Sequence, residues 1–340
     1  MFVEVIILIL FKTGFLILDL FTIIILAAFF IGLASQFSIL LAIGLILIIA
    51  GFFYETRKDW SNLKIKDLKF SSCLSMKDFN NFLAVVLGGL VTFALTQTIG
   101  ISAVLASGLV GIVAYILVPN YEIPAFTGSF VGMASYSLLP GYRYLILAGL
   151  ISGIVYVIGK YSFKGFGGKL GTTAFIGTVL AAVFTGQNFT GGTIPGGNMI
   201  YLLILYSVIG AVLTYILHIR FKISAVFSSG LIGVLAALIL PIFYPANGAT
   251  LAVMAYCASF AGMSSKDRIS NEFIMIVGAI LTALIFIFTS PYLNGTGGKL
   301  GTTAFASVIT IKGLTILLNK TVYSGIFKEK FQLSESNQSS

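Results

Sequence analysis

The chain has 340 residues, of which 58% are hydrophobic and 9% charged, with a net charge of +9 and a mean hydropathy of +1.05. A soluble globular domain is about a quarter charged, so this composition excludes soluble enzymes, disulfide-rich secreted domains and disordered chains. The apolar residues form long runs, and a helix needs about 20 of them to cross a bilayer. An outer-membrane barrel is excluded, because its strands would alternate apolar and polar residues.

The apolar runs predict an all-α polytopic integral membrane protein with about 12 transmembrane helices. The first run contains Lys12, Thr13 and Gly14 and predicts one tilted or broken helix. In chain order the predicted spans are 2–33, 36–54, 82–99, 101–118, 124–139, 144–160, 170–187, 199–217, 223–243, 247–263, 272–290 and 301–318.

Positive charge divides the predicted loops into two groups. Cytoplasmic loops of membrane proteins are enriched in Lys and Arg, which predicts that the basic loop 55–81 and the tail 319–340 are cytoplasmic. If the spans alternate in direction from there, 17 of the 20 Lys and Arg residues are cytoplasmic. The exceptions are Arg143, Lys299 and Lys312. We therefore expect a multi-pass protein of the plasma (inner) membrane with both termini cytoplasmic. Since the positive charge lies between spans, its expected partner is the lipid bilayer and not nucleic acid.

Segments of the first half of the chain recur in the second half. The N-terminal helices 1–54 stand outside this duplication, which covers residues 82–190 and 200–318. Three matched pairs carry it: 167–175 with 297–305, identical throughout; 101–111 with 223–233, identical at eight of eleven positions; and 127–135 with 257–265, identical at five of nine.

Each copy contains five predicted spans, an odd number, so the second copy must enter the membrane from the opposite side. The charge pattern agrees, because it assigns the loop 160–169 to the cytoplasmic side and its counterpart 291–299 to the outside. Inverted repeats are the architecture of many secondary transporters, with the solute site at the repeat interface near the bilayer midplane. We therefore expect a core of two five-helix inverted repeats (5+5) and a function as a transporter or channel for a small solute.

The first candidate site segments lie where proline and small residues interrupt corresponding spans. Such interruptions at matching positions of two repeats indicate a solute site. The alternative is helix packing without solute contact, because small residues let helix backbones approach closely. The candidate solute-binding residues of this pair are Ser129, Phe130, Gly132, Ser259, Phe260 and Gly262.

The second candidate pair is the nine-residue segment that stands unchanged in both copies. It opens a helix in each copy, and helix starts favour anions whereas a lysine there opposes the helix dipole. A lysine kept twice in this place indicates a compensating negative group: an anionic solute, a carboxylate or a lipid phosphate. The alternative is a lysine whose ammonium extends to the membrane interface. The candidate residues are Gly167, Gly168, Lys169, Thr172, Thr173, Gly297, Gly298, Lys299, Thr302 and Thr303.

Catalytic and metal chemistry is poorly supported by the sequence. With only Cys73, Cys257 and His218 available as soft or imidazole ligands, no metal-binding pattern is present. We predict no enzyme activity, no cofactor and no metal, and a solute that is small and weakly preferred to be an anion. The alternatives are a structural or partner subunit of a membrane complex, or an intramembrane enzyme. The oligomeric state, the coupling ion and the direction of transport stay open.

Overall fold

The structure is a computed structural model that describes residues 2–34, 39–63 and 75–336. Within these ranges the chain forms helices and no strand, so the prediction of an all-α protein is confirmed. Part of the basic loop 55–81, with Lys64, Lys66, Lys69 and Cys73, lies outside the described residues.

Twelve α-helices follow one another in the described part of the chain. They are α1 (Phe2–Leu33), α2 (Ile39–Asn62), α3 (Met76–Ala94), α4 (Ala103–Leu117), α5 (Glu122–Gly132), α6 (Tyr142–Ile158), α7 (Lys169–Phe184), α8 (Asn198–Tyr215), α9 (Ala225–Phe243), α10 (Gly248–Gly262), α11 (Glu272–Thr289) and α12 (Lys299–Ser336). One π-helical turn extends α3 over Leu95–Ile99, and another extends α8 over Ile216–Arg220.

Six of the helices are long and apolar enough to cross a membrane, which is consistent with a multi-pass membrane protein. These segments are Val5–Leu33, Met76–Ile99, Asn198–Arg220, Ala225–Phe243, Glu272–Thr289 and Lys299–Lys320. Four further apolar helices, α4, α6, α7 and α10, are shorter than 18 residues. The predicted number of about 12 spans is therefore supported only in part.

Three predicted boundaries differ from the structure. The predicted span 124–139 ends early, because α5 has 11 residues and rises only about 16 Å, about half the ~30 Å hydrocarbon core. In contrast, α2 is longer than predicted: it continues past residue 54 to Asn62, so the basic stretch 55–81 begins as helix. Similarly, α12 continues through most of the predicted tail 319–340 to Ser336. The first predicted span is one continuous helix.

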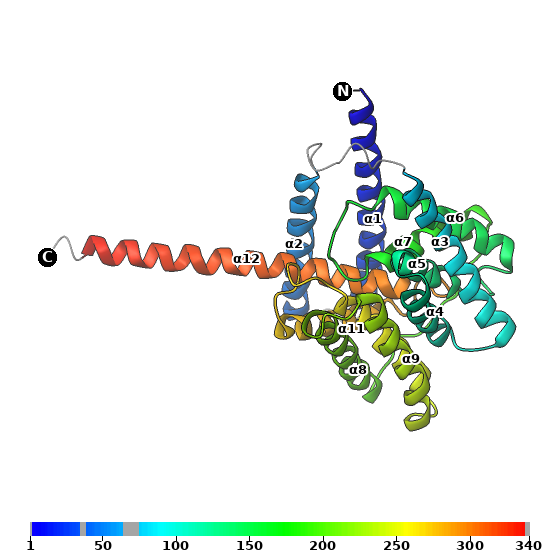
Figure 1. Cartoon of the computed structure of the whole chain (residues 1–340). Coiled ribbons are helices and arrows are strands. Elements are labelled where there is room, and N and C mark those ends of the chain that lie inside the picture. Colours follow the sequence, from blue (N-terminus) through cyan, green and yellow to red (C-terminus); the bar gives the residue numbers. More distant parts are fainter. Residues whose placement is uncertain (1, 35–38, 64–74, 337–340) are drawn as a thin grey trace.

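The two copies of the duplication use the same helix contacts. In the first copy α3 packs against α5 and α6, and in the second copy α8 packs against α10 and α11. Likewise α6 packs against α7 as α11 packs against α12. Between copies, α4 lies against α9 and α7 lies against α12. Outside the duplication, α1 contacts α7, α11 and α12, and α2 packs along α12, which extends to one side of the molecule (Figure 1).

Candidate functional site

The two identical nine-residue segments meet at the start of α7 and α12. A β-carbon on Gly168 would collide with the Gly301 carbonyl and the Phe305 amide, and one on Gly298 would collide with their counterparts in the other copy. Both glycines adopt left-handed φ values, 83° and 84°, that other residues rarely adopt. The contacts are reciprocal between the copies, which is the pattern that a two-fold axis produces.

Each of the two lysines binds the end of the preceding helix. Lys169 Nζ donates to the carbonyls of Gly159 and Ser162 at 2.7 and 2.6 Å, beyond the end of α6. These bonds place the ammonium at a helix C-terminus, where the dipole favours a cation.

The second lysine repeats this arrangement. Lys299 Nζ donates to the carbonyls of Thr289 and Tyr292 at 2.8 and 2.5 Å, and to Asn294 Oδ1 at 2.8 Å. The Lys299 residue is 9% exposed. Among the described residues both ammonium groups bond to backbone and amide oxygens and to no carboxylate, so the predicted carboxylate partner is not found. An anionic solute, a lipid phosphate and an ammonium at the membrane interface stay predictions. Backbone carbonyls supply the compensation in both copies.

The four candidate threonines are buried and bonded within their own helices. Thr172 and Thr302 donate to the carbonyls of Gly168 and Gly298, at 3.4 and 3.3 Å. Thr173 and Thr303 donate to the carbonyls of the two lysines, at 3.2 and 3.1 Å. Each hydroxyl thus bonds back to the carbonyl four residues earlier, which is a usual partner of a threonine inside a helix.

Serine hydroxyls pair at the interface between the two copies. Ser129 lies 2.7 Å from Ser107 on α4, and Ser259 lies 2.7 Å from Ser229 on α9, measured between the Oγ atoms. Ser107 also lies within 2.9 Å of the Tyr256 hydroxyl, so this tyrosine of α10 reaches the serine pair of the other copy. All these side chains are buried. The prediction missed Ser107 and Ser229, although both are identical positions of the matched segments 101–111 and 223–233.

Four aromatic rings form a cluster that contacts the serine pair of Ser107 and Ser129 through Tyr256. Phe130 and Phe260 lie 4.7 Å apart between ring centroids, and Phe126 and Tyr256 pack on them. The candidate glycines of the same segments serve helix packing, because a β-carbon on Gly132 would meet α3 and one on Gly262 would meet α8. Gly167 and Gly297 similarly lie against the carbonyls of Phe260 and Phe130, so the two predicted segment pairs meet one another.

A cavity of about 300 Å³ opens onto two of these aromatic rings. It lies between α4, α5, α9, α10 and the start of α12, and its polar lining consists of hydroxyls and glycine backbone. A second cavity, of about 520 Å³, shares Val253, Gly295, Thr296 and Leu300 with the first and reaches Lys299. Of the predicted site residues, Phe130, Phe260 and Gly298 line the first cavity and Lys299 the second; the others line neither.

Equivalent polar contacts occur on the two sides predicted to face opposite compartments. The Ser265 amide donates to the Gly165 carbonyl at 2.9 Å, and the Ser135 amide donates to the Gly295 carbonyl at the same distance. The first pair joins loops predicted to be cytoplasmic. The second joins the loop 291–299, predicted to be outside, to the outer end of the predicted span 124–139.

One hydrogen bond distinguishes the two sides. Ser224 Oγ donates to Glu122 Oε2 at 2.9 Å and connects the start of α9 to the start of α5. In the matched segments the counterparts of these residues are Ser102 and Ala252, which line the 300 Å³ cavity. A cavity therefore lies at Ser102 and Ala252, whereas a hydrogen bond joins their counterparts Ser224 and Glu122.

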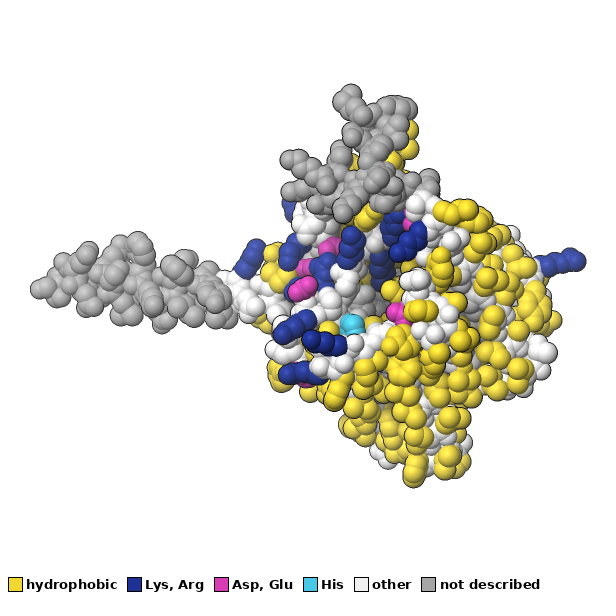
Figure 2. Space-filling view, in the orientation of Figure 1, with side chains coloured by type: hydrophobic (Ala, Val, Ile, Leu, Met, Phe, Trp, Pro, Cys, Tyr) yellow, Lys and Arg dark blue, Asp and Glu magenta, His cyan; other side chains and the backbone are white. Residues whose placement is uncertain are grey.

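An ion-pair cluster joins three segments predicted to be cytoplasmic. The Arg268 guanidinium donates to Glu55 and Asp59 of α2 at 3.0 and 2.9 Å and to the Lys164 carbonyl at 2.9 Å. It also lies 4.1 Å from the centre of the Phe166 ring. Burial raises the pKa of Glu55, against the opposite effect of the nearby cations. In Figure 2 most Lys and Arg side chains gather near α1 and α2, whereas hydrophobic side chains cover most of the surface to the right and below.

Comparisons with protein-family models, with curated proteins and with solved structures find no match to this chain. The functional argument therefore depends on the arrangement of its residues alone.

Proposed function

We propose that this chain is a membrane transporter that moves a small solute between two inverted five-helix repeats by alternating access. One observation carries the proposal: equivalent contacts of the two copies, Ser265 with Gly165 and Ser135 with Gly295, lie at span ends that the charge pattern assigns to opposite sides. Two oppositely oriented copies form a site that either side can reach.

The solute path that we propose begins in the outer cavities and ends at the four aromatic rings and the serine pairs. In the present state the hydrogen bond between Ser224 and Glu122 bridges the cytoplasmic side. In the opposite state the outer positions Ser102 and Ala252 would approach one another, and the cytoplasmic pair would separate. Rocking of one repeat against the other around a fixed site is the usual form of such a transition.

The solute that we propose carries no positive charge. Among the described residues no carboxylate lines either outer cavity, whereas Lys299 and the start of α12 contribute positive potential. The three hydrogen bonds of the Lys299 ammonium are all used within the protein. The lysine therefore favours an anion or an uncharged solute through its field and not through a direct hydrogen bond.

Filling the outer cavity with a large side chain is expected to abolish transport. Ala249 is exposed and lines the 300 Å³ cavity, so the indole of an Ala249→Trp variant would occupy the proposed path. Reconstituted protein would be tested for uptake of inorganic anions, small carboxylates, polyols and small organic cations. Wild-type protein is expected to move a member of the anionic or uncharged classes, and Ala249→Trp is expected not to.

The matched control is Ile242→Trp, which adds the same indole at a position that is 74% exposed and lines neither outer cavity. Its uptake is expected to equal that of the wild type. Uptake of a cation would contradict the proposed charge of the solute. Equal uptake by Ala249→Trp and the wild type would contradict the proposed path.

A further inference from the structure

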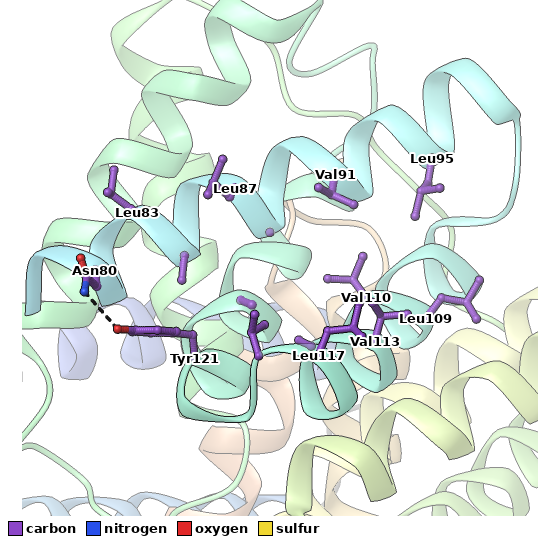
Figure 3. A pocket seen from close by; sticks show the side chains of 15 residues that line it. Asn80, Leu83, Leu87, Val91, Leu95, Leu109, Val110, Val113, Leu117 and Tyr121 are labelled. Atoms are coloured by element: carbon purple, nitrogen blue, oxygen red, sulfur yellow. Dashed lines mark hydrogen bonds between the residues drawn. The ribbon is translucent and has the colours of Figure 1, made fainter. Parts of the chain in front are cut away.

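An apolar groove lies between α3 and α4 on the surface of the first copy. Its volume is about 520 Å³, and Figure 3 shows aliphatic side chains of both helices along its length. Two polar side chains stand together at one end, where Asn80 Nδ2 donates to the Tyr121 hydroxyl at 3.0 Å. Its lining residues on α3 include Leu83, Leu87 and Val91. The groove is thus apolar along most of its length and polar at one end.

We propose that this groove binds one acyl chain of an anionic glycerophospholipid of the cytoplasmic leaflet, with the headgroup at Lys77. This inference rests on the orientation in the proposed function, which puts the start of α3 at the cytoplasmic face. It does not depend on whether the chain moves a solute.

The length and register of α3 fit such a ligand. Lys77, Asn80, Ala84, Leu87 and Val91 follow one another at intervals of three and four residues, so they lie along one face of the helix. From Asn80 to Leu95 the helix rises about 22 Å, more than the ~15 Å that one leaflet contributes to the hydrocarbon core. An acyl chain entering at Asn80 therefore fits within the groove. Lys77 stands one turn beyond Asn80, at the depth of a headgroup.

The charges near the polar end favour an anionic headgroup. Lys77 is exposed. Two described carboxylates at this end of the helices have partners within the protein: Asp78 accepts from Lys160 Nζ at 2.9 Å, and Glu122 accepts from Ser224. A lysine beside the cytoplasmic surface attracts anionic lipids. Asn80 and Tyr121 add an amide and a hydroxyl at the level where glycerol ester groups lie.

The second copy shows that the groove is not a necessary result of the helix arrangement. Tyr206 of α8 stands where α3 has Ala84, and its hydroxyl donates to the Tyr244 hydroxyl of the α9–α10 turn at 3.3 Å. The two tyrosine rings, 5.9 Å apart, cross the corresponding gap. Met199 replaces Lys77 in the same comparison. The copy with the open groove is the copy with the lysine.

Native mass spectrometry of the purified full chain tests the proposal, with phosphatidylglycerol and phosphatidylcholine as probes. Wild-type protein is expected to retain one phosphatidylglycerol more tightly than phosphatidylcholine. Ala84→Tyr introduces the side chain that blocks the second copy and is expected to lose this lipid. Lys77→Met introduces the residue that the second copy has at this position. This variant is expected to bind phosphatidylglycerol about five-fold more weakly, the effect of removing one cation from a membrane surface.

Leu205→Tyr is the matched control, because it adds a tyrosine on the exposed face of α8, outside the groove. It is expected to bind the lipid as the wild type does. Equal retention by Ala84→Tyr and the wild type, or equal affinity for the two lipids, would overturn the proposal. Lys77 is exposed, so the Lys77→Met variant keeps the test valid if Ala84→Tyr does not fold. A protein that retains the lipid but moves no solute would contradict only the proposed transport.

Discussion

Replacing Arg268 by glutamine is expected to lower the free energy of unfolding by about 3–5 kcal/mol, the usual effect of removing one partner from a buried ion pair. The Glu55 side chain is fully buried and that of Asp59 is 7% exposed. Without the guanidinium, Asp59 would lose its ion-pair partner and Glu55 would keep only Lys58, at 3.9 Å. The bond to the Lys164 carbonyl would be lost as well. Unfolding in detergent, followed by circular dichroism, measures the effect.

Arg220→Gln provides the matched control. Arg220 also pairs with one carboxylate, Glu272 at 2.7 Å, but its side chain is 67% exposed. An exposed pair contributes at most about 1 kcal/mol, so this variant is expected to unfold close to the wild type. Equal losses of stability in the two variants would show that the Arg268 cluster does not hold α2 to the repeats.

Replacing Lys299 by methionine is expected to destabilise the protein and not merely to weaken solute binding. Methionine nearly preserves the length of the side chain but leaves the carbonyls of Thr289 and Tyr292 without their donor. Hydrogen bonds to a charged group contribute about 1.5–3 kcal/mol each, and Lys299 makes three. The same change at Lys169 removes two such bonds and is expected to have the same direction.

The control for both lysines is Lys222→Met, at an exposed position. Thermal unfolding of the three variants in one detergent separates the explanations. If Lys299→Met unfolds at the temperature of the wild type yet loses solute binding, the lysine is a solute ligand and the helix-end role is wrong.

The role of the lysines shows where the sequence is informative and where it is not. A lysine at a helix start opposes that helix's own dipole, and this part of the prediction needs only the sequence. The partner belongs to the end of the preceding helix, a tertiary contact. One signal pointed to it: only ten residues separate the end of α6 from the start of α7, so the two ends had to lie close together.

Hydropathy identifies the membrane class and residue identity identifies the duplicated segments, but neither locates the end of α5. The residues after Gly132 are still mostly apolar, so the predicted span continued to residue 139. The backbone leaves the helix because the Ser135 amide pairs with Gly295 of the other copy. Pairing between residues 160 positions apart has no local signal. The serine pairs could have been predicted from the sequence, because Ser107 and Ser229 occupy identical positions of the two copies.

Cysteine accessibility at one position of each copy tests the inverted arrangement most directly. Thr98 and Arg220 occupy corresponding positions of the duplication, and both are exposed. In a background with Cys73→Ser and Cys257→Ala, single Thr98→Cys and Arg220→Cys variants would be treated with a membrane-impermeant maleimide. We predict that Thr98→Cys reacts in intact cells and that Arg220→Cys reacts only after the membrane is opened. Reaction of both from the same side would contradict inverted repeats, and with them the alternating-access transporter.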